Sequence, residues 1–232
     1  MAFSLASLNN TDHPLGRSIY LKQGVSMAEP FDSLYKLQKQ DTAKAAETFA
    51  DAFSEDPVWN AIFSEIRNDH RRICATYESP VLYCLRYGSV YAISKRLEGV
   101  AAWVPGEVSN FTFWRMLKSG GLGAGMKIGF KIAKKMMPIF KPIEEDRKKH
   151  MAGKEYIYLQ ILGVARKFQK RGLGGKLLRA VIAESEQTRK ALYIETETEE
   201  NVTMYKHFGF EVIQKIELPL ITLPMWEMVR NV

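Results

Sequence analysis

A short glycine-rich stretch, Gln169–Gly175, is the feature that most constrains what this chain can fold into. The run before it, from Tyr156 to Val164, is β-branched and aromatic, which is typical of a largely buried strand. The run after it places Leu173, Leu177, Leu178, Val181 and Ile182 on one face of a helix. A strand, a glycine-rich turn and a helix favour phosphate binding, because glycines allow close approach and a helix N-terminus offers unpaired N–H groups.

Two common phosphate-binding loops do not fit this stretch. A Walker A loop needs a glycine five residues before its Gly-Lys pair and a hydroxyl residue after it, but these positions hold Lys170 and Leu177. The dinucleotide fingerprint fails too, since after Gly172-Leu173-Gly174 its third small residue falls on Leu177. Nucleoside triphosphates and dinucleotides are therefore disfavoured, and the plainest alternative is a glycine-tolerant turn without a ligand.

The remaining pattern, Gln-x-x-Gly-x-Gly, resembles the pyrophosphate loop of the GCN5-related N-acetyltransferases (GNATs). The resemblance is specific over residues 156–231 and loose over 32–231; it extends to Leu162-Gly163-Val164, Asn201, Tyr205 and Gly209-Phe210. Within the superfamily the chain is most similar to the branch that contains puromycin N-acetyltransferase. That similarity rests on Asp51-Ala52-Phe53, Asp56-Pro57, Ala102–Pro105, Leu192–Thr196 and Trp226-Glu227-Met228. It implies direct acetyl transfer from acetyl-CoA to a small-molecule amine.

The resemblance also implies which residues would hold the coenzyme. The backbone from Arg171 to Gly175 would bind pyrophosphate, and the open edge of the strand 162–164 would pair with the pantetheine amides. That edge has to splay from the strand 191–196, at a bulge near Leu162. The implied coenzyme-binding residues are Leu162, Gly163, Val164, Gln169, Lys170, Arg171, Gly172, Leu173, Gly174, Gly175, Asn201 and Tyr205.

Tyr205 is the general acid that the resemblance implies, with a helix-packing tyrosine as the alternative. Since a thiol has a pKa near ~8.5 and a phenol near ~10, a tightening hydrogen bond describes its role better than full proton transfer. Asn201 would hold the coenzyme or cap the helix 202–208.

Glu195 is the first candidate for the general base, and Tyr158 or Glu197 acting through water is the second. A base is demanded only by a strongly basic acceptor, because deprotonating an alkylamine of pKa ~10.4 at pH 7 costs ~4–5 kcal/mol. The alternative role for Glu195 is to fix the neighbouring loop by hydrogen bonds.

The order of predicted elements indicates an α/β chain with the GNAT acyl-CoA N-acyltransferase fold, a strongly twisted mixed sheet with helices on both faces. Strands are expected at 33–38, 87–94, 97–104, 156–164, 191–196, 210–218 and 225–230. Helices are expected at 41–53, 56–63, 69–86 with a bend at Pro80, after the glycine loop, and at 200–208. Residues 31–232 are predicted to form one acetyltransferase domain, and the polar residues 1–30 a flexible or extended arm.

A helical insertion is expected at about 110–150, between the third and fourth strands. An apolar patch at 111–117 precedes a glycine run at 120–125, which should break the helix. A lysine-rich amphipathic helix follows, and Pro138 and Pro142 should end it. Three interpretations stay open: a substrate-covering lid hinged at the glycines, helices packed on the sheet, and a basic helix on a membrane surface.

Composition limits the remaining classes. The chain has 232 residues, 46% of them hydrophobic, which is typical of a globular protein. Cys74, Cys84 and four scattered histidines give neither a disulfide framework nor a metal-ligand spacing, so a cytoplasmic protein without a metal is expected. No apolar run reaches the ~18–20 residues of a membrane span, and the N-terminus lacks the pattern of a signal peptide.

The formal charge of +7 fits nucleic acid, a membrane surface or a polyanionic ligand such as coenzyme A. No aromatic-basic motif supports nucleic acid, and integral membrane contact is not expected. A homodimer is compatible with the sequence. The alternatives to a small-molecule enzyme are a protein or peptide acetyltransferase acting on lysine or N-terminal amines, a catalytically silent acyl-CoA-binding regulatory module, and a surface binder that uses the lysine-rich insertion.

Overall fold

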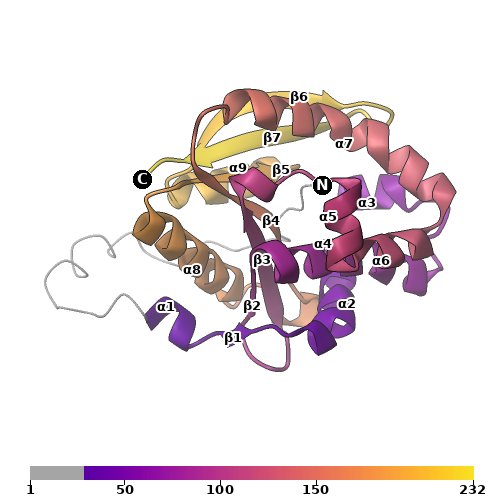
Figure 1. Cartoon of the computed structure of the whole chain (residues 1–232), viewed down its shortest axis with the longest axis horizontal. Helices are drawn as coiled ribbons and strands as arrows, with labels where there is room; N and C mark the ends of the chain where they lie inside the picture. Colours follow the sequence, from indigo (N-terminus) through magenta and orange to yellow (C-terminus); the bar gives the residue numbers. More distant parts are fainter. Residues whose placement is uncertain (1–28) are drawn as a thin grey trace, which may run out of the picture.

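The computed structural model describes residues 29–232, so the predicted arm at 1–30 lies almost wholly outside the described residues. Its strands form one mixed sheet in the order β1-β2-β3-β4-β5-β7-β6 (Figure 1). They are β1 (Tyr35–Lys36), β2 (Ser89–Ala92), β3 (Gly99–Pro105), β4 (Tyr156–Val164), β5 (Ala191–Thr196), β6 (Glu211–Leu218) and β7 (Leu223–Arg230). The predicted α/β class and the order of strands are confirmed, although the first strand is shorter than expected.

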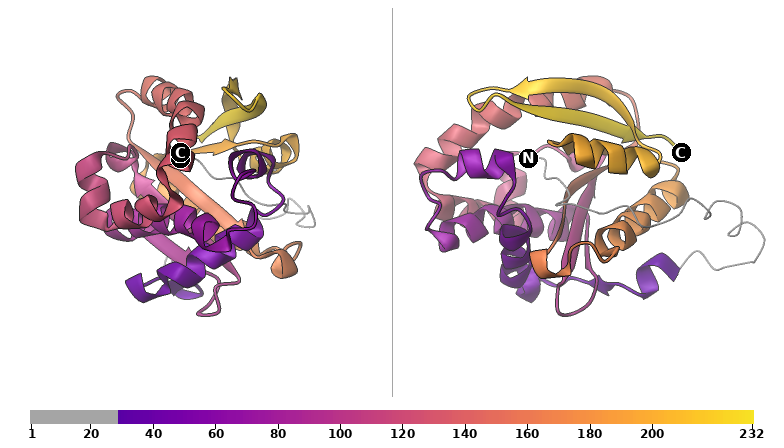
Figure 2. Two further views of the ribbon diagram at one scale, coloured as in Figure 1. Left: turned by 90° about the vertical axis from the view of Figure 1, so that its right-hand side faces the viewer. Right: turned by 180° about the vertical axis from the view of Figure 1, so that it is seen from behind.

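The helices cover both faces of this sheet (Figure 2). They are α1 (Glu29–Asp32), α2 (Thr42–Ala52), α3 (Pro57–Ile62), α4 (His70–Tyr87), α5 (Phe113–Ser119), α6 (Gly121–Ile128), α7 (Phe130–His150), α8 (Leu173–Thr188) and α9 (Glu199–His207). One apolar core lies beneath α2, α3, α4 and α7, and a second lies beneath α8 and α9. Because β4 alternates between the two cores, all nine of its residues are buried.

The centre of the sheet forks between β4 and β5. These two strands run parallel and pair only from Tyr156↔Ala191 to Tyr158↔Tyr193. Beyond that point β4 stays paired with β3 alone, and β5 stays paired with β7. The predicted splay is therefore confirmed. The bulge lies at Gln160, two residues before Leu162, because Ala102 pairs with Ile161 and Trp103 with Leu159.

Three residues were considered as N-caps of helices; one of them caps its helix, and the other two do not. Asp56 accepts a hydrogen bond from Trp59 N at 2.9 Å, as an N-cap before Pro57 should. Asp41 precedes α2 but makes no such cap, since its carboxylate accepts from Gln38 N and Tyr35 Oη instead. Asn201 is not the cap of α9, because Thr198 fills that position and accepts from Asn201 N.

The insertion forms α5, α6 and α7, and one expectation about it is wrong. The glycine run does break the helix, because α5 ends at Ser119 and Gly120 is its left-handed cap with φ +82°; the following glycines then form α6. Gly121 suits the contact of α6 with α4, because a Cβ there would meet Ser79 O at 3.1 Å. Pro138 and Pro142 lie inside α7, whose buried face of Ile132, Met136, Ile139, Phe140 and Ile143 offsets the lost backbone hydrogen bonds. Helix packing accounts for this inner face, while the lid interpretation stays a prediction.

Within residues 29–232, every helix is too short or too polar to cross a lipid bilayer.

Candidate active site

The predicted glycine loop joins β4 to α8 and is held by its own side chains and turns. Gln169 Nε2 donates to Val164 O at 3.0 Å, which closes the loop back onto the strand end. Lys170 and Gly172 both have left-handed backbone conformations, with φ +61° and +73°. Gly172 precedes α8 and gives it no side-chain cap, so the first-turn N–H groups of Leu173, Gly174 and Gly175 are left for an outside acceptor.

The far half of β4 presents its backbone to the fork. Ala165 N donates to Glu98 O, at the start of β3. Because successive N–H groups of a strand point to opposite sides, those of Leu162 and Val164 face away from β3 and into the gap beside β5. Gly163 cannot carry a larger side chain without rearrangement, since a Cβ there would lie 2.9 Å from Phe49 Cδ1. An extended ligand can therefore add to this edge as a further strand.

Basic side chains surround the loop, and one ties it to α2. Arg166, Lys167, Lys170 and Arg171 are exposed, which suits a ligand with several phosphate charges. Arg166 N donates to Asp51 Oδ2 at 2.7 Å, and the Arg166 guanidinium pairs with Glu55. The loop and the α2–α3 turn are thus fixed to each other at the mouth of the fork.

A cavity of about 180 Å³ lies at this mouth. Its walls come from the α2–α3 turn, the β4–α8 loop and the β5–α9 loop, and include Asp56, Gln169, Glu197 and Asn201. The predicted residues Gln169 and Asn201 are therefore brought together. Four of the lining residues carry carboxylates (Glu55, Asp56, Glu197 and Glu200), and Arg166 is the one cation among them.

Tyr205 is buried on α9, where its ring meets Phe210 edge to face at 5.3 Å between centroids. Burial, and after it the nearby carboxylate of Glu197, raise the pKa of Tyr205 well above its ordinary value. The phenol therefore stays protonated at any physiological pH, as a hydrogen-bond donor must. The contact with Phe210 also fits the alternative role of Tyr205, that of a tyrosine that packs its helix.

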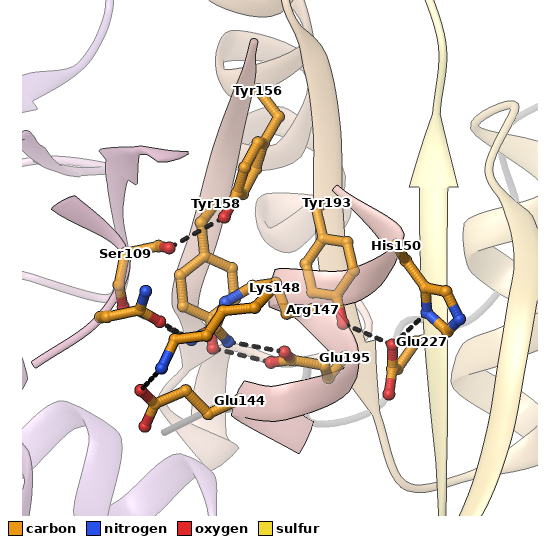
Figure 3. A network of polar contacts seen from close by, with 11 residues as sticks. Ser109, Glu144, Arg147, Lys148, His150, Tyr156, Tyr158, Tyr193, Glu195 and Glu227 are labelled. Carbon is orange, nitrogen blue, oxygen red and sulfur yellow. Dashed lines mark hydrogen bonds and ion pairs between the residues drawn. The ribbon is translucent and has the colours of Figure 1, made fainter. Parts of the chain in front are cut away.

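Glu195 lies on β5 just past the fork, within a buried polar network (Figure 3). Its Oε1 accepts from Arg147 Nη1 at 2.9 Å, and its Oε2 accepts from Tyr158 Oη at 2.7 Å. Arg147 also lies over the Tyr158 ring, 4.2 Å from its centroid. Both oxygens of the predicted base are thus engaged by groups from α7 and β4.

A second buried carboxylate, Glu227 on β7, lies opposite Glu195 in the antiparallel β5–β7 pair. Its Oε2 accepts from Tyr193 Oη at 2.8 Å and lies 3.2 Å from His150 Nδ1 (Figure 3). Burial, opposed in part by these hydrogen bonds and reinforced by the charge of Glu195, raises the pKa of Glu227 to about 7. Neutral pH is therefore the range in which this group changes charge.

The sequence reasoning missed Arg147, His150 and Glu227, although two signals were present. Arg147 follows Ile143 by four residues and so continues the buried face of α7. Glu227 stands among apolar residues in a strand, where an acid is rarely buried without a partner. His150 is a partly exposed residue in a charged run and gives no comparable signal.

Several buried polar atoms near the fork have no hydrogen-bond partner within the described part of the chain. They are both amide atoms of Gln160, Arg147 Nε and Glu227 Oε1. Such atoms are costly to bury, and they suit a space that a polar ligand or water fills. The two cysteines offer no alternative chemistry, because burial raises the pKa of Cys74 to about 11 and that of Cys84 higher still.

Comparison with known proteins agrees with this geometry. The family model described as an acetyltransferase (GNAT) domain matches residues 141–212. An uncharacterized N-acetyltransferase of Schizosaccharomyces pombe is 28% identical over 189 residues, which cover 79% of this chain and 76% of the relative.

Two solved structures share the fold. The first, described as histone acetyltransferase HPA2 and related acetyltransferase from Corynebacterium glutamicum, aligns with a TM-score of 0.60 at 15% identity, over 86% of this chain and 95% of that one. The polyamine N-acetyltransferase of Drosophila melanogaster, which forms N-acetylagmatine, aligns with a TM-score of 0.58 at 12% identity, over 86% and 99%.

The Glu227 carboxyl should give the protein a pH-dependent stability. Its pKa is raised on folding, so its contribution is fully present below the ordinary pKa of about 4.5 and is lost as the pH rises through about 7. A glutamine at this position stays neutral at every pH. Glu227→Gln should therefore avoid roughly 2–3 kcal/mol of the decrease in unfolding free energy that the parent shows at high pH, and should be more stable than the parent at pH 8. Urea unfolding between pH 4.5 and 8 measures this. Glu217→Gln, on the exposed side of β6, is the control; the same pH slope in Glu227→Gln and the parent would contradict the assignment.

Proposed function

We propose that the chain is an acetyl-CoA-dependent enzyme of the GCN5-related N-acetyltransferases and that it acetylates the amine of a small molecule directly, in a ternary complex. The observation that carries the proposal is the fork: the open edge of β4, the uncapped start of α8 and a carboxylate-lined cavity meet at one place. A small, cationic acceptor suits the cavity, because its carboxylates outnumber its one arginine. The structural likeness to a polyamine N-acetyltransferase supports the same class of acceptor.

The coenzyme fits the residues present. Its pyrophosphate would be held by the N–H groups of Leu173, Gly174 and Gly175, with Lys170 and Arg171 beside them. Its pantetheine amides would pair with the edge at Leu162 and Val164. When bound, acetyl-CoA supplies an activated acetyl thioester. A Leu162 or Val164 N–H that faces the gap can donate to the thioester carbonyl oxygen and stabilise the charge that develops there.

We assign to Tyr205 the role of proton donor toward the leaving sulfur. The α9 helix holds the phenol in the core beneath α8 and α9, close to the carboxylate of Glu197 and so to the cavity. Because its pKa is raised, the hydroxyl assists by a hydrogen bond that strengthens as the sulfur gains charge.

We assign to Tyr158 and Glu195 the removal of the acceptor's proton. Tyr158 Oη already donates to Glu195 Oε2 at 2.7 Å. The tyrosine oxygen can take a proton from the acceptor's ammonium nitrogen while its own proton passes to the Glu195 carboxylate. The ammonium and the carboxylate both become neutral, and the nitrogen is left with a free lone pair for attack. Arg147 then fixes the position of the carboxylate through its other oxygen. Glu197, which lines the cavity, is the competing base.

The first test of this function is Tyr205→Phe. The change keeps the ring that packs on Phe210 and removes the proton, so kcat should fall by roughly 10²-fold or more. KM for acetyl-CoA should change little, because coenzyme binding rests on the loop and the strand edge. Thiol release from acetyl-CoA measures both, first across diamines, arylalkylamines and lysine peptides. Acceptance of peptides alone would contradict a small-molecule acceptor, and full kcat in Tyr205→Phe would make this tyrosine structural.

The second test uses acceptor amines of graded basicity. Glu195→Gln keeps the shape and one hydrogen-bonding oxygen but cannot accept the proton, so kcat/KM should fall most for alkylamines and least for weakly basic amines. A purely structural glutamate would lower the rates of all acceptors by the same factor. Glu197→Gln is the matched comparison: if it, and not Glu195→Gln, shows the dependence on amine basicity, the base is Glu197.

A further inference from the structure

The insertion between β3 and β4 carries the positive charge of the whole chain. Residues 108–143 contain no Asp or Glu and seven basic residues: Arg115, Lys118, Lys127, Lys131, Lys134, Lys135 and Lys141. The complete chain has 33 basic and 26 acidic residues, a formal charge of +7. The charge of the insertion equals this total, so the rest of the chain is balanced.

The same segment exposes most of the large apolar side chains that face solvent. Ten such side chains are exposed among the described residues, and six belong to the insertion: Phe113, Trp114, Leu117, Met126, Phe130 and Met137. Phe130 is 83% exposed and Met137 is 74% exposed. Single exposed apolar residues are normal, but a concentration of this kind in one segment marks an interaction surface.

These residues form stripes in which apolar and basic side chains alternate. Along α7, Phe130, Lys134, Met137 and Lys141 follow one another at intervals of four, three and four residues, and so share one helical face. On α5, Phe113 and Leu117 are four residues apart, and so are Trp114 and Lys118, so that these two pairs form neighbouring rows on the helix. We call these eight residues, together with Met126 of α6, the insertion surface.

The insertion packs on the rest of the molecule through the buried apolar face of α7, and polar contacts beside that face hold it, which leaves the insertion surface facing outward. Lys127 pairs with Glu78 of α4 at 3.0 Å, and Lys131 pairs with Glu65 at 2.6 Å. Lys135 donates to the carbonyl oxygen of Ala61 in α3 at 2.8 Å. α6 and the first part of α7 lie on the side of the molecule away from α8 (Figures 1 and 2). The coenzyme loop at the start of α8 is therefore not part of the insertion surface.

Three partners are considered for the insertion surface: a second copy of the chain, nucleic acid and a lipid membrane. Charge and composition favour one of them. A second copy would bring an equally positive surface against this one, which opposes association. Arginine is the residue favoured for nucleic-acid recognition, together with aromatic platforms on which bases stack, whereas six of the seven basic residues here are lysines. The Phe113 and Trp114 rings meet at 77° and form no flat stacking platform. Apolar side chains flanked by lysines are the pattern that lies in a lipid headgroup region, where lysine stems extend toward the phosphates.

We propose that the insertion surface docks reversibly on an anionic phospholipid membrane. The apolar side chains enter the headgroup boundary, and the lysines contact anionic headgroups. This docking is separate from acetyl transfer, since no residue of the insertion surface belongs to the fork.

Flotation of the full-length chain with lipid vesicles tests the proposal. Binding is expected to vesicles containing about a third phosphatidylserine, and not to pure phosphatidylcholine, with a decrease as salt is raised. Phe130→Ser with Met137→Ser, and separately Lys118, Lys134 and Lys141 all changed to Gln, should each weaken binding about tenfold or more. Matched controls are Leu220→Ser, an exposed apolar side chain elsewhere, and Lys39, Lys95 and Lys154 all changed to Gln.

Three outcomes would overturn the proposal. One is equal binding to neutral and anionic vesicles. Another is binding that the control lysine set reduces as much as the insertion set. The third is tight binding of single-stranded RNA with no vesicle binding, which would identify the surface as a nucleic-acid site. Transfer to a soluble amine should be unchanged in both insertion variants, so failure of docking is distinguishable from failure of the proposed enzyme.

Discussion

The end of pairing between β4 and β5 is the constraint on which the rest of this molecule depends. Two parallel strands that stop bonding after Tyr158 and Tyr193 leave backbone groups that need another partner. On β4 these are the N–H groups of Leu162 and Val164. After the loop that follows this strand, α8 begins without a side-chain cap. An elongated ligand that carries amides at one end and phosphates at the other satisfies both sets of groups. The proposed coenzyme site therefore rests on backbone groups of the fork and not on any special side-chain chemistry.

A buried ion pair holds the base of this fork. Arg147, from the last turn of α7, lies over the ring of Tyr158 on β4 and bonds to Glu195 on β5. Burying such a pair is expensive, and removing one partner typically costs about 3–5 kcal/mol because the other charge is left uncompensated. In return, the two strands are tied together at the point where their backbones separate. The insertion thus has an inner end that supports the site and an outer face that carries the chain's excess charge.

The sequence predicted the fold because its local patterns agree with one another. The apolar run of β4, the glycine loop and the amphipathic face of α8 all indicate one strand–turn–helix unit, and the structure has it. Differences from the prediction arose where tertiary packing overrides a local preference. Pro138 and Pro142 lie within α7 because its buried apolar face offsets their cost, and the glycines after Gly120 form a helix that packs against α4. Most of the predicted coenzyme residues lie on one segment, 162–175, and follow from its motif, whereas the buried network joins α7, β4, β5 and β7. No spacing in the sequence shows that Arg147 meets Glu195, and only their burial periodicity hints that either is inside.

Hydrogen–deuterium exchange tests the central claim, that the fork edge and the start of α8 are the coenzyme site, most directly. With acetyl-CoA added, the amides of Leu162 and Val164 and those of the first turn of α8 should exchange more slowly, because each gains an acceptor. The paired strands β6 and β7 should not change, and Gly174→Asp, which places a negative charge beside the pyrophosphate, should abolish the protection. Unchanged exchange at Leu162, Val164 and Leu173–Gly175 under saturating acetyl-CoA would contradict the account.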